Sequence, residues 1–96
     1  MSCLHTINKT SLLHDMDTCI SILTPDDAIL FIEDGVYCCI DDNSIKGAVP
    51  GFKFYAQLED LQARGLVGKI RSDIKSVNYD EFVQLCCAHK KVVSWF

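Results

Sequence analysis

The sequence predicts a small α/β domain in which a parallel sheet of four to five strands carries helices on both faces. Residues 28–32 form an unbroken apolar run, which is typical of a central parallel strand covered on both sides. Helical patterns precede and follow this run, so strands and helices alternate along the chain. Such alternation produces a parallel sheet with right-handed crossovers. We expect residues 1–96 to form one domain.

The first strand is expected at residues 3–8, and an amphipathic helix should follow it. This helix ends before Pro25, because the residue that precedes a proline disfavours the helical conformation. The buried strand at residues 28–32 comes next. The helix before Pro25 is predicted from apolar residues that recur with the spacing of one helix face. These residues are Leu12, Met16, Cys19, Ile20 and Leu23.

A turn and a short helix are expected directly after the buried strand. Asp34-Gly35 closes the strand, and residues 41–51 form a loop that contains asparagine, serine, two glycines and Pro50. One apolar face of the short helix between them is formed by Val36, Cys39 and Ile40.

The second half of the chain is expected to hold three further strands. An aromatic strand at residues 52–56 leads into a helix at residues 58–64, which has acidic residues in its first turn and an Arg-Gly pair at its end. A short link then leads to a strand at residues 74–77. Residues 92–96 are β-branched and aromatic, which favours an edge strand at the C-terminus.

The last helix has the clearest pattern in the sequence. Asn78 is a good N-cap residue, and Glu81 occupies the position that completes a capping box. The apolar stripe that follows, which we expect to face the core, consists of Tyr79, Phe82, Val83 and Cys86.

Composition limits the classes of function. Nine basic residues stand against 13 acidic ones, so the chain offers no basic surface for direct binding of nucleic acid. No targeting segment or membrane span is visible, and we expect a cytoplasmic protein. A domain of 96 residues buries only about 60–68% of its unfolded surface, so contact with other subunits would add stability.

The six cysteines are interpreted as reduced thiols, as is usual in the cytoplasm. The pairs Cys38-Cys39 and Cys86-Cys87 are adjacent in sequence, so their side chains diverge by about 100° on a helix and form no metal half-site. We expect no metal and no cofactor. Cys39 and Cys86 are predicted to be small core residues, and Cys38 and Cys87 surface thiols or subunit contacts.

Other polar and aromatic residues favour structural roles. Asp34-Gly35 offers one glycine, whereas a phosphate loop needs several, so a structural turn is the better interpretation. The three histidines share no spacing, and His5 is expected to be a polar core residue or an interface contact. A cluster of aromatic residues is predicted first as core, with the alternative that a domain of this size presents part of it to a partner. The cluster consists of Phe52, Phe54, Tyr55, Tyr79 and Phe82.

Several short segments follow one another in a fixed order across nearly the whole chain. They are Leu4-His5-Thr6, Glu33-Asp34-Gly35-Val36, Tyr55-Ala56, Asp60-Leu61-Gln62-Ala63-Arg64-Gly65, Asp73-Ile74, Tyr79, Phe82-Val83 and Ser94-Trp95. As an ordered set they resemble the DsrH/TusB family of bacterial sulfur-relay subunits. The resemblance implies an accessory subunit that joins TusC/DsrF-like and TusD/DsrE-like chains in a hetero-oligomer. It also implies a relay of persulfide sulfur toward 2-thiouridine at the tRNA wobble position.

By this resemblance, Cys19 aligns with the cysteine that DsrH-type members carry in their first helix and is the candidate persulfide carrier. The match favours an alternative role as the DsrH subunit of a DsrEFH sulfur-oxidation complex. Burial on the apolar stripe, and the carboxylate of Asp15 one turn earlier, favour instead a structural cysteine with a raised thiol pKa. A helix capped by Asp15 would lower that pKa.

A third alternative is a homo-oligomeric α/β module that binds a small anionic ligand at the strand ends. The single glycine of Asp34-Gly35 and the acidic net charge argue against this alternative.

Overall fold

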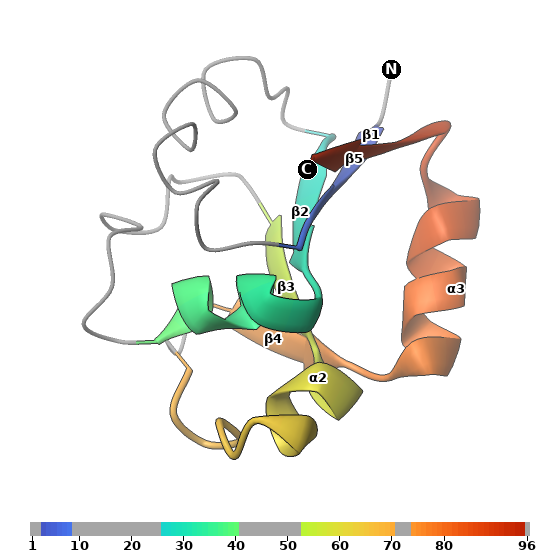
Figure 1. The fold of residues 1–96 in the computed structure, drawn as a ribbon. Coiled ribbons are helices and arrows are strands. Elements are labelled where there is room, and N and C mark those ends of the chain that lie inside the picture. Colours follow the sequence, from blue (N-terminus) through green and yellow to red (C-terminus); the bar gives the residue numbers. More distant parts are fainter. Residues whose placement is uncertain (1–2, 9–25, 41–52, 71–73, 96) are drawn as a thin grey trace.

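The computed structural model describes residues 3–8, 26–40, 53–70 and 74–95. These residues contain a five-stranded sheet in the order β4-β3-β2-β1-β5, and every pairing is parallel (Figure 1). The α/β fold expected from the sequence is therefore confirmed. The strands are β1 (Cys3–Ile7), β2 (Ala28–Phe31), β3 (Lys53–Gln57), β4 (Ile74–Val77) and β5 (Lys91–Trp95).

Strand β2 lies at the centre of the sheet because all of its side chains are apolar and buried. Leu4 of β1 pairs with Ala28 on one side, and Phe54 of β3 pairs with Ile29 on the other. Strand β5 forms an edge beside β1, as its short β-branched sequence predicts.

Helices cover both faces of the sheet, as expected. The 3-10 helix η2 (Glu33–Cys39) and helix α2 (Leu58–Ala63) lie on one face, and helix α3 (Tyr79–Ala88) lies on the other (Figure 1). The helix predicted before Pro25 and the loop predicted at residues 41–51 lie outside the described residues. None of the described helices has the length and apolar character needed to cross a membrane.

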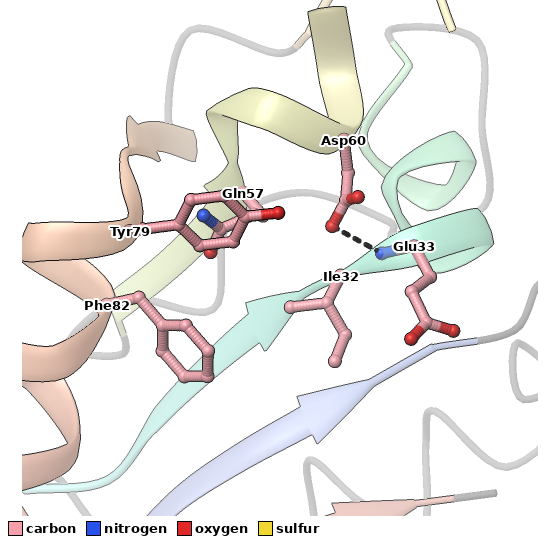
Figure 2. Close-up of a pocket in the computed structure, with 6 residues that line it drawn as sticks. All are labelled: Ile32, Glu33, Gln57, Asp60, Tyr79 and Phe82. Atoms are coloured by element: carbon pink, nitrogen blue, oxygen red, sulfur yellow. Dashed lines mark hydrogen bonds between the residues drawn. The ribbon is translucent and has the colours of Figure 1, made fainter. Parts of the chain in front are cut away.

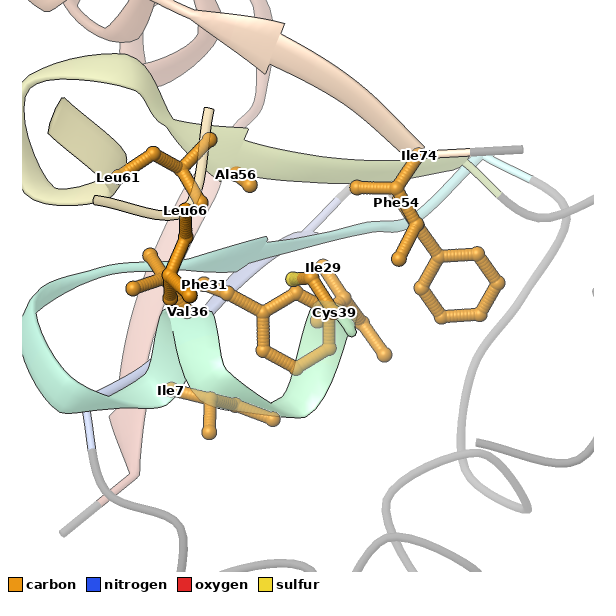
Figure 3. Close-up of a cluster of buried hydrophobic side chains, with 10 residues drawn as sticks. All are labelled: Ile7, Ile29, Phe31, Val36, Cys39, Phe54, Ala56, Leu61, Leu66 and Ile74. Atoms are coloured by element: carbon orange, nitrogen blue, oxygen red, sulfur yellow. The ribbon is translucent and has the colours of Figure 1, made fainter. Parts of the chain in front are cut away.

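The larger part of the core lies between the sheet and the helices η2 and α2 (Figure 3). Val36 and Cys39 of η2 are fully buried there, and Ile40 packs against them, as the helical spacing predicted. The cluster consists of Ile7, Ile29, Phe31, Val36, Cys39, Phe54, Ala56, Leu61, Leu66 and Ile74.

The opposite face of the sheet is covered more thinly, because α3 is the only helix that the structure describes over it. None of the α3 side chains is buried. Phe82, Leu85 and Cys86 are half-buried and pack against the sheet. The buried residues beneath them are Leu4, Ala28, Leu30 and Val77.

The prediction that the whole α3 stripe faces the core is wrong for two residues. Tyr79 is 56% exposed and Val83 is 60% exposed. Tyr79 is therefore not part of the aromatic core. The reason is geometric: successive helical residues are about 100° apart, and the apolar stripe spans a wider arc than the strip of helix that contacts the sheet. Phe54 is buried and Tyr55 is half-buried, whereas Phe52 lies outside the described residues.

The capping box predicted at the start of α3 is confirmed. Asn78 Oδ1 accepts a hydrogen bond from the Glu81 N–H at 2.9 Å, and Glu81 Oε1 accepts one from the Asn78 N–H at 3.2 Å. The helix therefore begins at the residue that the local sequence indicates.

His5 is a buried polar residue of the sheet, as expected. Its Nε2 lies 3.7 Å from Asp27 Oδ2, and both side chains are almost entirely buried. Asp27 Oδ1 also accepts a hydrogen bond from the Cys3 N–H at 2.8 Å. The carboxylate thus joins the start of β1 to the residue that precedes β2.

Candidate functional site

A pocket of about 190 Å³ lies at the carboxyl ends of strands β2 and β3 (Figure 2). Ligand sites of parallel α/β proteins gather at this edge of the sheet. The ends of β2 and β3, the start of η2 and the first turns of α2 and α3 all contribute to its wall. The lining residues are Ile32, Glu33, Gln57, Asp60, Tyr79 and Phe82.

Two acidic side chains of α2 accept hydrogen bonds from the neighbouring helices around the pocket. Asp60 Oδ2 accepts a hydrogen bond from the Glu33 N–H at 2.8 Å, which anchors the start of η2. Glu59 Oε2 accepts one from the Tyr79 N–H at 3.2 Å, which anchors the start of α3. Carboxylates are favourable at both positions because the first N–H groups of a helix have no partner within it.

Glu33 has a strained backbone at the entrance of the pocket. Its φ of +50° lies in the left-handed region, which a side chain other than glycine rarely adopts. The hydrogen bond from its N–H to Asp60 helps to hold this conformation. Strained residues of this kind concentrate at functional sites.

Gln57, the last residue of β3, places an unpaired acceptor at the pocket. The side chain is 1% exposed, and its Nε2 donates a hydrogen bond to Glu59 Oε1 at 2.7 Å. Its Oε1 is buried and has no hydrogen-bond partner among the described residues. A buried acceptor without a donor is rare and unfavourable in proteins.

The surroundings of the pocket are acidic. Desolvation raises the pKa of Glu59, but hydrogen bonds from its own N–H, the Gln57 amide and the Tyr79 N–H outweigh it and lower the pKa below its ordinary value. Arg64 pairs with two of the neighbouring carboxylates: its Nη2 donates to Asp34 Oδ1 at 2.8 Å and its Nη1 lies 3.7 Å from Asp60 Oδ1. The hydrogen bond with Asp34 raises the Arg64 pKa, so this guanidinium stays charged.

The ionisable groups that line this pocket are two carboxylates and one phenol, those of Glu33, Asp60 and Tyr79. The lining residues include no cysteine, serine, threonine, histidine or lysine. No three His, Cys, Asp or Glu side chains of the described residues gather closely enough to hold a metal ion. The pocket presents oxygen acceptors beside two aromatic rings.

Gly35 supports the interpretation of Asp34-Gly35 as a structural turn. A methyl group at Gly35 would lie 2.0 Å from the Ile7 carbonyl oxygen, so only glycine fits against the end of β1. The Gly35 N–H donates to the Ile32 oxygen at 2.8 Å and closes the turn.

Cys19, the candidate persulfide carrier, lies outside the described residues, as does Asp15. Cys39 is buried and Cys87 is exposed, as predicted, and Cys86 is half-buried against the core. Desolvation and the neighbouring Asp27 raise the pKa of Cys3, although Lys91 and a backbone hydrogen bond lower it. Desolvation and the adjacent Cys87 raise the pKa of Cys86. Raised pKa values reduce the thiolate fraction at neutral pH.

The sequence predicts a ligand site at the strand ends only under the third alternative, and it does not predict the residues that line this pocket. The acidic residues at positions 59 and 60 are predicted only as the first turn of a helix. The available signal was their position, because Gln57, Glu59 and Asp60 follow a predicted strand directly and the carboxyl ends of parallel strands meet at one edge.

Comparisons with known proteins identify a family for this chain. Residues 10–92 match the family model described as "DsrH like protein". The chain is 38% identical to "Protein TusB" of Escherichia coli O81 (strain ED1a), over 96% of this chain and 99% of the relative. It is 36% identical, with the same coverage, to "Protein TusB" of Shigella dysenteriae serotype 1 (strain Sd197).

Proposed function

Because the chain belongs to the DsrH family, which its TusB relatives share, we propose that it is an accessory subunit of a cytoplasmic sulfur relay. In this relay, persulfide sulfur passes between the thiols of successive proteins toward 2-thiolation of the tRNA wobble uridine. The chain would join TusC-like and TusD-like subunits in a hetero-oligomer and help to hold the sulfur-carrying subunit in place. Full-length matches to proteins named TusB support this choice.

The main structural support is the exposure of apolar side chains on helix α3. Helix α3 has no buried side chain, and the two apolar residues on its flank, Tyr79 and Val83, are more than half exposed. A small domain that leaves apolar side chains in this position gains stability when a partner covers them.

The exposed apolar side chains lie on one flank of α3. Glu81, Gln84 and Leu85 line a hollow of about 230 Å³ toward β3 and β4. At about 100° per residue, Tyr79 and Val83 lie on the other flank of the helix, away from this hollow. Val92 of β5 pairs with Leu4, whose side chain faces α3, and is 47% exposed on the same side of the sheet. We call Tyr79, Val83 and Val92 the α3 flank and propose it as the subunit contact.

The environments of three described thiols, those of Cys3, Cys39 and Cys86, support an accessory role. Persulfide transfer needs an accessible thiol with a lowered pKa, whereas the pKa values of Cys3 and Cys86 are raised by burial. Cys39 is fully buried beneath η2.

Co-expression with TusC-like and TusD-like subunits tests assembly. We expect the wild-type chain to co-purify with both and Val83→Arg to lose the complex, because an arginine cannot be buried at an apolar contact without a partner. Gln84→Arg is the matched control on the opposite flank and should assemble normally. Equal assembly of both variants would contradict the proposed contact.

Genetic complementation tests the biological role. In cells that lack their own TusB, this chain should restore 2-thiouridine in tRNA, measured by mass spectrometry of nucleosides. If the chain assembles with the partners but does not restore 2-thiouridine, its proposed role in tRNA thiolation is contradicted. Its membership of the family would be unaffected.

The alternative role is a DsrH subunit with Cys19 as the sulfur carrier. The resemblance of Cys19 to the cysteine that DsrH-type members carry in their first helix supports this alternative, and position 19 lies within the residues that match the family model. After incubation with a persulfide donor, mass spectrometry should then show a mass gain of one sulfur atom that Cys19→Ser abolishes. An adduct that persists in this variant, or none on the wild-type chain, would assign Cys19 a structural role.

A further inference from the structure

The pocket at the carboxyl edge of the sheet is equipped to receive a cation. Every polar side-chain atom that lines it is an oxygen acceptor, apart from the Gln57 amide nitrogen, which is already bonded to Glu59, and the Tyr79 hydroxyl. Glu33 and Asp60 line the pocket, and the carboxylates of Glu59 and Asp34 lie beside these residues. Among the described residues, the guanidinium of Arg64 is the cation that pairs with this group. An anion would be repelled here, whereas a group rich in N–H donors would be attracted.

The buried oxygen of Gln57 gives a second and independent indication of a ligand. The amide cannot be reversed, because its nitrogen donates to Glu59 Oε1 at 2.7 Å and an oxygen in that place would face a carboxylate. Gln57 Oε1 therefore keeps its position and lacks a donor. A donor supplied from outside would satisfy it.

The aromatic residues of the pocket favour a planar hydrogen-bond donor. Tyr79 and Phe82 enter the pocket from α3, opposite Ile32 and Glu33 at the end of β2 (Figure 2). A planar guanidinium stacks on aromatic rings and directs several N–H groups in fixed directions, which an ammonium does not. A volume of about 190 Å³ suits one such head group and is smaller than a typical small-molecule site.

We propose that this pocket receives the guanidinium of an arginine side chain from a partner subunit of the relay complex, an inference that rests on the proposed function. Tyr79 belongs both to the pocket and to the α3 flank, so a chain docked on the flank reaches the pocket directly. The half-exposed Tyr79 ring shifts to stack on the guanidinium, which pairs with the Glu33 carboxylate and donates one N–H to Gln57 Oε1. The acidic pocket thus selects a basic residue on the partner.

Binding to the isolated full chain can be measured by NMR titration with N-acetyl-arginine amide. The neutral isostere N-acetyl-citrulline amide and the ammonium analogue N-acetyl-lysine amide are the comparison compounds. We expect the arginine compound to shift the Gln57 side-chain amide and the Tyr79 and Phe82 ring signals, with citrulline at least about tenfold weaker and lysine in between. No shift, or equal binding of arginine and citrulline, would overturn the inference.

Glu33→Gln is the decisive variant, because this exposed side chain has no bonded partner among the described residues and its substitution leaves the core untouched. It should weaken arginine binding about tenfold, whereas Asp80→Asn, which removes an exposed carboxylate of α3 outside the pocket, should have no effect. Gln57→Leu should weaken binding further, and its NMR spectrum reports whether it remains folded.

The partner's contribution is measured in the complex with TusC-like and TusD-like subunits. Glu33→Gln should speed dissociation about tenfold, and the difference from wild type should shrink in high salt. If the wild-type chain forms the complex and Glu33→Gln dissociates from it at the same rate, the arginine contact is overturned and the proposed function stays intact. Failure of the wild-type chain to join any complex would overturn the proposed function itself.

Discussion

Gly35 packs against the backbone of Ile7 so closely that a methyl group at Gly35 would lie 2.0 Å from the Ile7 carbonyl oxygen. The same carbonyl accepts a hydrogen bond from the Ile32 N–H at 2.9 Å, so it cannot move away without loss of this bond. The close packing of the end of β1 against the turn that follows β2 therefore requires a glycine at position 35.

Gly35→Ala is expected to lower the free energy of unfolding by about 1–3 kcal/mol or more, because the added methyl group overpacks a backbone contact. Urea unfolding followed by circular dichroism measures the change. Gly65→Ala is the matched control: its φ of +66° is left-handed, but nothing lies within 4 Å of the new methyl group. It should cost only the conformational penalty of about 1–2 kcal/mol. A loss at Gly35 smaller than that at Gly65 would contradict the close packing.

Asn78→Ala should destabilise the protein by about 0.5–2 kcal/mol, since the Glu81 N–H loses its acceptor at the start of α3. Asn78→Asp keeps an acceptor in place and should remain close to wild type. The two variants can be compared by their urea midpoints. Equal losses in both would mean that the side-chain oxygen does not stabilise the helix.

Stability is expected to fall in acid partly through Glu59. The pKa of Glu59 is lowered in the folded protein. Its contribution to the free energy of unfolding is therefore fully present above its pKa in the unfolded chain, about 4.3, and is lost as the pH falls through its pKa in the folded protein. Glu59→Gln should therefore be less stable than wild type at pH 7, and this difference should shrink below pH ~4. Urea midpoints measured over this pH range test the prediction. Asp80→Asn, the charge control, should not reproduce the pH dependence.

The thiols should differ in their rates of alkylation by iodoacetamide. Cys87 is exposed and should react first, whereas Cys39 is buried and should react only after unfolding. Cys3 and Cys86 should be slow at neutral pH and faster as the pH rises, because burial raises their pKa values. Peptide mass spectrometry gives the order. Rapid modification of Cys39 in the native protein would contradict the packing of η2.

The sequence alone was sufficient for the elements whose signals are local. The apolar run Ala28–Phe31 indicated a central strand because a strand covered on both faces has no polar side to alternate with. Asn78 and Glu81 indicated the start of α3, since a capping box involves residues only three apart. The alternation of strands and helices then led to a parallel sheet.

Only the tertiary structure decided which residues meet at the pocket. Asp60 accepts the N–H of Glu33, a residue 27 positions earlier, and that contact depends on how β2 and β3 align in the sheet. The exposure of Tyr79 and the unpaired oxygen of Gln57 likewise depend on how α3 lies across strands far from it in sequence. Periodicity gives the apolar arc of a helix, but the packing partners determine how much of that arc is covered.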